Sequence, residues 1–330
     1  MNDIYIGLLV LTVCSAGAFF AGRSLARVLS PGWCDLAALT VFAGLVAYIL
    51  LLWDHVWLAR LLPFSNLIII GNWFPVATGL QAGLVWQRIA HARFRRGLSV
   101  TALTVVSFYA VVHPLQGDVP ECRNQWSGDV CLQTSPYTCS AASAATLLRA
   151  HNLDATEQEM AELCLTRRGT TWQGLYRGLV RKTAGTAWRV EVFNGSVSDL
   201  ALMGPAPVLL NVGLPVDQEV DPNYIAENGW IPGMRHTVVF FGFTEFREVL
   251  MGEPTWGLEH WRLEDLQLLW KGQGLRLVPR DSVEQPGASG PTEIASLWNS
   301  LRLTSARPNA VAASRYSVAS EATAFRSIED

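Results

Sequence analysis

The sequence predicts an α+β domain that follows an all-α transmembrane region of about four helices. Half of the 330 residues are hydrophobic and only 16% are charged, and the apolar excess lies before about Gln116. After Gly117, charged and turn residues return, with helical patterns first and strand-like runs afterwards. Helices segregated from an antiparallel sheet are typical of the α+β class. We therefore expect a transmembrane region at 1–116, a globular domain at 117–279 and a disordered tail at 280–330.

Four apolar stretches are long enough to cross a bilayer. A hydrocarbon core of about 30 Å needs about 20 apolar residues in a helix, because backbone groups cannot stay unpaired in lipid. The third stretch is long enough to tilt or to kink at Pro75. The first follows Met-Asn-Asp rather than basic residues, so we interpret it as a retained anchor and not as a signal peptide. The four stretches, none of which contains Asp, Glu, Lys or Arg, are 4–22, 36–53, 61–87 and 97–116.

Arginines in the loops predict the orientation of these spans. Arg23 and Arg27 follow the first span and four arginines follow the third, whereas only Arg60 lies between the second and third. Cytoplasmic loops carry the excess of Lys and Arg. A multi-pass protein of the cell membrane is therefore predicted, with its globular domain on the extracytoplasmic, periplasmic side. This orientation requires the fourth stretch to cross.

Charge and cysteine usage limit the function further. The net charge is -3, which argues against nucleic acid as a partner, since phosphate binding needs clustered basic residues on the domain. Cys122 and Cys131 lie just after the last span and could form a short-loop disulfide in an oxidising compartment. Spacing alone does not fix connectivity, so both the bridge and free thiols remain open.

The globular half begins with helices. A run rich in Ala predicts a helix from Cys139 to Ala150, a capping box at Thr156 opens a second towards Cys164, and a third starts near Thr170. Alternating or β-branched runs then predict strands, followed by a short helix and a last strand. The predicted strands are 188–193, 207–212, 236–243, 248–251 and 275–278, and the short helix is 263–270.

Four residues form a candidate catalytic constellation. Cys139 opens a helix, where the pKa of a thiol falls and a nucleophilic thiolate forms. His236 starts a strand that can bring an imidazole to the thiol as general base, and Glu253 is spaced to orient the imidazole. Gln133 precedes the helix and can donate to an oxyanion. Each residue alone is more often structural, and Cys139 alone is more often a buried core thiol, so their order and setting carry the prediction.

Together these motifs resemble the double-glycine peptidases, papain-like domains that trim leaders from bacteriocin precursors. The resemblance spans 131–278 and includes Pro-Val-Leu-Leu at 207–210, His-Thr-Val-Val-Phe-Phe-Gly at 236–242 and Glu-Pro at 253–254. It implies a papain-like fold in which Gln133 is the oxyanion donor, Cys139 the nucleophile, His236 the base and Glu253 the orienting acid. Two positions depart from the family: Ser140 stands where Gly is usual, and Glu253 where Asp is usual.

The function expected is a membrane-bound cysteine peptidase acting on a peptide or protein, with no metal or organic cofactor. Without a GxxxxGK[ST] loop the chain does not hydrolyse ATP by that route, and whether an exporter or another membrane protein is a partner stays open. An inactive binding or regulatory module, or an acyl transferase or amidase, are the alternatives. We expect Pro215–Gly233 to overhang the cleft, and Glu259 and His260 are rivals for supporting roles.

Overall fold

The computed structural model describes residues 2–89, 92–203, 206–246 and 248–280, so the predicted tail, apart from Arg280, lies outside the described residues. Within the described part, four helical segments are long and apolar enough to cross a membrane, which agrees with the four expected stretches. They are Asn2–Val28, Pro31–Leu51, Leu67–Arg88 and Arg93–Leu115. The helices reach further into the basic loops than the apolar stretches alone predict, because arginine stems can lie along a helix while their charges reach water.

The third span is broken rather than kinked. Helix α3 (Leu67–Ile70) ends at Gly71, and α4 (Phe74–Arg88) begins with Pro75 in its first turn. A proline there has no N–H to leave unpaired, so it starts a helix more easily than it bends one. Asn72 fills the gap, since its side chain accepts from the N–H of Phe74 at 3.3 Å and donates to the carbonyl of Ala110 at 3.0 Å.

Glycines bring α1 (Asn2–Val28) and α4 into backbone contact. A methyl group on Gly79 would lie 2.5 Å from the carbonyl oxygen of Ser15, and one on Gly83 would overlap that of Phe19. Small residues at such positions allow the close approach on which helix packing in lipid depends. By contrast, α2 (Pro31–Leu51) and α5 (Arg93–Val112) expose most of their apolar side chains, as expected of surfaces that face lipid. Short 3-10 turns, η1 (Val56–Arg60) and η2 (His113–Leu115), follow these two helices.

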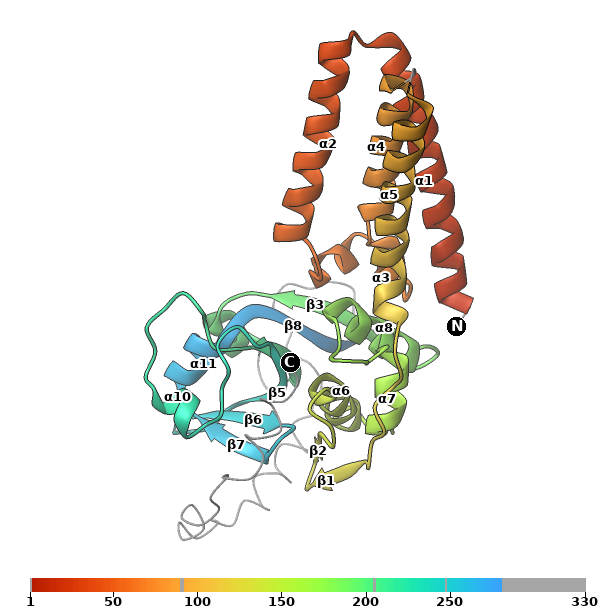
Figure 1. The fold of residues 1–330 in the computed structure, drawn as a ribbon. Helices are drawn as coiled ribbons and strands as arrows, with labels where there is room; N and C mark the ends of the chain where they lie inside the picture. The colour runs from red at the N-terminus through yellow and green to blue at the C-terminus, as the bar shows by residue number, and fades with distance from the viewer. Residues whose placement is uncertain (1, 90–91, 204–205, 247, 281–330) are drawn as a thin grey trace. The chain divides into compact units, whose positions relative to one another are not determined.

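The globular domain is a helical layer packed on an antiparallel sheet, as the sequence predicts (Figure 1). A small hairpin of β1 (Gln125–Ser127) and β2 (Val130–Leu132) precedes α6 (Cys139–Arg149), α7 (Glu157–Leu163) and α8 (Trp172–Lys182). The main sheet has the order β3-β8-β4-β5-β6-β7. Its strands are β3 (Trp188–Asn194), β4 (Val208–Val212), β5 (His236–Phe243), β6 (Val249–Glu253), β7 (Gly257–Trp261) and β8 (Trp270–Pro279), with short helices α9 (Val197–Leu202), α10 (Asn223–Ala226) and α11 (Leu263–Leu269) between them.

Local signals explain why the helices start where they do. The hydroxyl of Thr156 accepts from the N–H of Glu159 at the start of α7, and that of Thr171 accepts from Gly174 at the start of α8, both at 3.0 Å. These side chains satisfy donors that the first helical turn leaves unpaired. Helix α8 also meets the end of α7 closely, because a methyl on Gly178 would overlap the sulfur of Cys164.

Helix α6 is the centre of the helical layer and lies against β5. Its residues from Ser140 to Leu148 are all buried. The hydroxyls of Ser140 and Thr237 share a hydrogen bond of 2.8 Å, and the hydroxyl of Ser143 donates to the carbonyl of Thr237 at 2.8 Å. The start of α6, which carries the predicted nucleophile Cys139, is thereby held against the start of β5, which carries the predicted base His236.

Candidate active site

Cys139 is the first residue of α6, as its motif predicts, and it is partly exposed. The sulfur lies 4.0 Å from the hydroxyl oxygen of Ser140. A thiolate at this point faces the unpaired N–H groups of the helix start, which stabilise negative charge. Cys139 therefore has access to solvent and a polar setting for ionisation.

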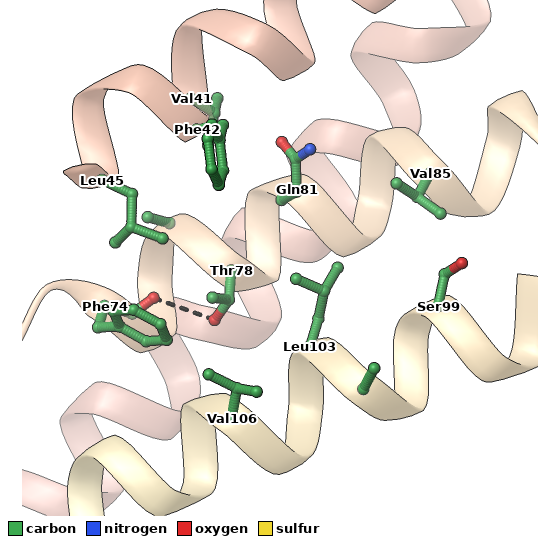
Figure 2. A pocket seen from close by; sticks show the side chains of 12 residues that line it. Val41, Phe42, Leu45, Phe74, Thr78, Gln81, Val85, Ser99, Leu103 and Val106 are labelled. Atoms are coloured by element: carbon green, nitrogen blue, oxygen red, sulfur yellow. Dashed lines mark hydrogen bonds between the residues drawn. The ribbon is translucent and has the colours of Figure 1, made fainter.

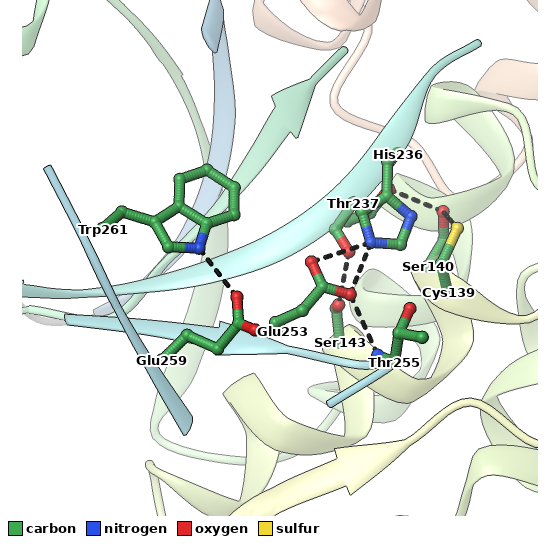
Figure 3. Close-up of polar contacts among 9 residues, drawn as sticks. All are labelled: Cys139, Ser140, Ser143, His236, Thr237, Glu253, Thr255, Glu259 and Trp261. Atoms are coloured by element: carbon green, nitrogen blue, oxygen red, sulfur yellow. Dashed lines mark hydrogen bonds and ion pairs between the residues drawn. The ribbon is translucent and has the colours of Figure 1, made fainter. Parts of the chain in front are cut away.

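His236 is the first residue of β5 and faces Cys139. It pairs across the sheet with Val212 on β4 and precedes Thr237, the residue that bonds to α6. Because its Nε2 is bonded to a carboxylate, the other ring nitrogen, Nδ1, is the one turned towards Ser140 and Cys139 (Figure 3). The imidazole side chain is 20% exposed, so one edge of the ring remains open to a substrate.

Glu253 ends β6 and provides the carboxylate. Its oxygens accept from Nε2 of His236 at 2.8 and 3.0 Å, and Oε1 also accepts from the N–H of Thr255 at 2.9 Å. The ladder between β5 and β6 ends at the pair Val239–Gly252, so Glu253 lies diagonal to His236. Diagonal neighbours are about 7–8 Å apart, a gap that the long Glu side chain spans. The carboxylate is only 6% exposed, so little water competes for this contact.

The three side chains shift one another's ionisation. Burial works against ionisation of the Cys139 thiol, but the charge and hydrogen bond of His236 outweigh it and lower the pKa of Cys139. Burial also disfavours the imidazolium, yet Glu253 and Cys139 raise the pKa of His236 to about 10. For Glu253 the burial effect is again overcome, here by His236, and the pKa of its carboxyl falls. The arrangement thus favours a thiolate–imidazolium pair supported by a carboxylate.

The other thiols of the globular domain behave in the opposite way. Burial raises the pKa of Cys122, Cys131 and Cys164 to about 12 in each case, with the Glu157 carboxylate adding to the first two. The sequence leaves open whether Cys122 and Cys131 form a disulfide, and in the structure both are free thiols. Reactivity at neutral pH is therefore concentrated at Cys139, because only the thiolate is nucleophilic.

Gln133 lies just after β2, and its backbone contacts the turn that follows Glu253. Its backbone N–H donates to the carbonyl of Pro254 at 2.7 Å, which joins the Gln133 loop to the turn after Glu253. The side-chain Oε1 is buried and has no hydrogen-bond partner among the described residues. An unpaired buried amide is costly and is often found where a ligand completes the bonding.

One tryptophan that the sequence does not single out borders the imidazole, and a second packs against the first. The ring of Trp230 meets that of His236 edge-on, with centroids 5.8 Å apart, and meets that of Trp261 at 6.0 Å. Trp230 belongs to the Pro215–Gly233 segment that was expected to overhang the cleft. Nothing in the local sequence marks this contact, because it joins distant parts of the chain.

The rivals to Glu253 have other partners. Glu259 accepts from the indole N–H of Trp261 at 2.8 Å, and burial raises the pKa of its carboxyl (Figure 3). His260 pairs with Glu248 at 3.1 Å, and both side chains are half exposed. Glu253 is therefore the carboxylate bonded to His236. Across the described parts of the chain, no group of three or more His, Cys, Asp or Glu residues is arranged to hold a metal ion.

A separate cavity lies among the membrane helices. It has a volume of about 480 Å³ between α2, α4 and α5 and is lined mainly by apolar side chains (Figure 2). Of its polar residues, Thr78 donates to the carbonyl of Phe74 at 3.0 Å, while the buried Oε1 of Gln81 has no partner in the described structure. None of the four predicted site residues lines it.

Comparison with known proteins gives only remote similarity. No family model matches the chain, and no curated protein matches it. Among solved structures, the peptidase domain of Streptococcus ComA, a bi-functional ABC transporter of a quorum-sensing pathway, is 17% identical with a TM-score of 0.35 and covers 45% of this chain and 96% of that domain. A double-glycine-motif protease from an AMS/PCAT transporter, bound to the leader peptide, has the same identity and TM-score. The match covers 49% of this chain and 96% of that protease. A periplasmic domain of the EpsAB fusion protein of the Vibrio vulnificus type II secretion system covers 45% of this chain and 50% of its own, with 17% identity and a TM-score of 0.27.

Proposed function

We propose that this protein is a membrane-bound cysteine peptidase that hydrolyses peptide bonds with Cys139 as nucleophile, His236 as base and Glu253 as orienting acid. One observation carries the proposal. A histidine bonded at 2.8 Å to a buried carboxylate turns its free nitrogen towards a partly exposed cysteine at a helix start. Nucleophile, base and orienting group in this order are the parts that acyl transfer needs.

The mechanism follows from the charges of the three groups. The Cys139 thiolate attacks the carbonyl carbon, and the developing oxyanion is held by the backbone N–H at the start of α6 and by the amide of Gln133. Half a turn of that amide exchanges its oxygen and nitrogen and aims an N–H donor where the unpaired Oε1 now lies. The His236 imidazolium protonates the leaving amine, and water then releases the acyl group from the sulfur with neutral His236 as base.

The two departures from the double-glycine pattern are compatible with this mechanism. Glu253 uses its additional methylene to reach a diagonal neighbour and still contacts Nε2 of His236 with both oxygens. Ser140 directs its hydroxyl to Thr237, so it fastens α6 to β5 and does not compete for the imidazole. Neither residue, by its contacts, favours an inactive binding module over an enzyme.

We infer that the substrate is a peptide or protein segment reached at the outer, periplasmic face of the cell membrane. Asp3 at the start of α1 and Asp54 between the second and third spans both contact the globular domain. The start of the first span and the end of the second then lie on the same side of the membrane as the domain. This arrangement supports an even number of spans before the domain. With the arginine-rich loops in the cytoplasm, such a count supports an extracytoplasmic domain beginning near Gly117.

The experiment uses the full chain in lipid nanodiscs with denatured casein and a synthetic peptide library as substrates. Peptide products identified by mass spectrometry are expected from the wild type, and Cys139→Ser should abolish them while Cys122→Ser should not. A peptide with a free amine is added as acyl acceptor, and mass spectrometry shows whether the acyl group ends on water or on that amine, which distinguishes a hydrolase from a transferase. A wild type that cleaves neither substrate, and whose Cys139 is alkylated no faster than Cys122, would show that the domain is not a peptidase.

A further inference from the structure

A single carboxylate from the membrane half contacts both layers of the globular domain. Asp54 follows α2 and is buried, with its side chain only 4% exposed. Its Oδ1 accepts from the N–H of Trp172, the first residue of α8, at 2.8 Å. Its Oδ2 accepts from Nη1 of Arg235 at 2.8 Å. Burial raises the pKa of the Asp54 carboxyl, and the helix start and the Arg235 cation both act against that rise.

The two partners of Asp54 belong to the two layers that carry the candidate catalytic residues. Helix α8 packs on α6, whose first residue is Cys139. Arg235 directly precedes His236 at the start of β5. The nucleophile therefore belongs to the layer held through Trp172, and the base to the strand held through Arg235.

Helix α8 is also fixed to the membrane half at a second point. Asp3 on α1 accepts from Nε of Arg177 at 2.8 Å and from Nη1 of Arg181 at 2.7 Å. The side chain of Arg177 is 3% exposed, so this contact is shielded from water. With α8 held by Asp3, the bond from Asp54 to Arg235 ties the start of β5 to the same support. The far side of the sheet has its own contacts to this support, because Arg60 donates to the carbonyl of Val192 on β3 at 3.2 Å and His55 bonds to Gln273 on β8 at 2.6 Å.

We propose that Asp54 is a positioning residue for the reaction, clamping α8 and the start of β5 together so that Cys139 and His236 stay within reach. The membrane helices then set the geometry of the catalytic pair as well as anchoring the domain. This inference rests on the proposed peptidase function. Misplacing reacting groups by about 1 Å can cost about 100-fold in rate, so a clamp of this kind matters for catalysis even though Asp54 is remote from the substrate.

The test uses Asp54→Asn in the full chain in nanodiscs, because the amide keeps the shape and an acceptor for Trp172 but loses the charge that holds Arg235. The expected result is a fall in kcat of between about fivefold and 100-fold with KM unchanged, since the substrate itself is not contacted. The pH profile of Cys139 alkylation by iodoacetamide should move to higher pH, because a displaced His236 stabilises the Cys139 thiolate less. A merely structural role would not shift this profile.

Three further variants test the same inference. Glu159→Gln is the matched control, because it removes the ion pair with Lys182 at the other end of α8, a contact of 2.6 Å. It should stay within about twofold of the wild type, as expected for a partly exposed pair. Arg235 is 57% exposed, so Arg235→Gln should fold even if Asp54→Asn does not, and it should reproduce the loss, whereas Arg235→Lys should restore most of the rate.

The outcomes separate this inference from the proposed function. A wild-type profile in both Asp54→Asn and Arg235→Gln, or an equal loss in Glu159→Gln, would overturn the positioning role while leaving the peptidase intact. A wild type that shows a low-pH Cys139 thiolate dependent on Asp54 but cleaves no substrate would support the positioning role and count against the peptidase.

Discussion

Replacing His236 with Ala tests the charge pair that the function depends on. The variant removes the charge and the hydrogen bond of His236, the two largest effects that favour the thiolate, and leaves the burial that opposes it together with the smaller contributions of Thr237 and Ser140. A thiol at the ordinary pKa of 9.0 is about 1% ionised at about pH 7. Lowering the pKa of Cys139 can therefore raise the thiolate fraction at that pH by at most about 100-fold, and the lower nucleophilicity of a low-pKa thiolate reduces the largest gain in rate to about tenfold. Because burial then raises the pKa of the thiol in the variant, alkylation at about pH 7 should fall by about tenfold or more.

The assay measures iodoacetamide labelling of the Cys139 peptide from about pH 5 to about pH 10 by mass spectrometry. In the wild type the thiolate persists below the ordinary thiol range and is lost as pH falls through the lowered pKa of Cys139, while His236 keeps its proton up to about 10. In His236→Ala the profile should move to higher pH than that of an ordinary thiol, because burial remains. Cys122 and Cys131, with pKa values of about 12, are internal references. Identical profiles for the two proteins would refute the charge pair.

Three further changes have expected outcomes. Glu253→Gln keeps an acceptor for His236 but removes the charge, so Cys139 alkylation at about pH 7 should fall by about threefold to tenfold, less than in His236→Ala. Gly178→Ala drives a methyl into the sulfur of Cys164, and overpacking of this kind should lower the free energy of unfolding, measured in detergent with guanidinium, by about 1–3 kcal/mol. Thr156→Ala removes the cap of α7 and should lower the same quantity by about 1 kcal/mol.

Each of these changes has a matched control. Glu259→Gln removes a neighbouring carboxylate that bonds to Trp261 and not to His236, and it should leave alkylation within about twofold. Adding Cys164→Ala to Gly178→Ala makes room for the methyl and should restore part of the stability; no recovery would mean that the overlap is not the cause. Thr156→Ser keeps the capping hydroxyl, so a loss equal to that of Thr156→Ala would contradict the capping explanation.

Elements with strong local signals were predicted well. The capped helices α7 and α8 and the strands β3 to β6 lie within one or two residues of their expected positions, because hydrophobic period and caps are short-range features. The elements β1, β2, β7, α9 and α10 were missed. The first two strands have three residues each, and β7 is an edge strand with an exposed Leu258 that weakens the apolar pattern. Strand β8 starts earlier than expected because two glycines near its beginning hide the strand pattern.

The candidate site was predictable in its residues but not in its geometry. A cysteine at a helix start and a histidine at a strand start can be recognised locally, and the structure brings both together with Glu253. The position of Glu253 diagonal to His236 depends on the register of β5 and β6, which the sequence does not specify. The contact of Trp230 with the imidazole depends on how a long connection folds back, and no local pattern predicts it.

The glycine contacts between α1 and α4 show that holding the protein in the bilayer and positioning the Asp3 carboxylate are two separate tasks of the first helix. A foreign span of equal length and hydropathy would retain the protein in the bilayer, since insertion depends on overall hydrophobicity. It would not seat against the main chain at Gly79 and Gly83, where there is no room for a different surface. The carboxylate of Asp3 would then lose its place beside Arg177. Swapping the first helix would thus leave the protein inserted but without the Asp3 contacts to α8.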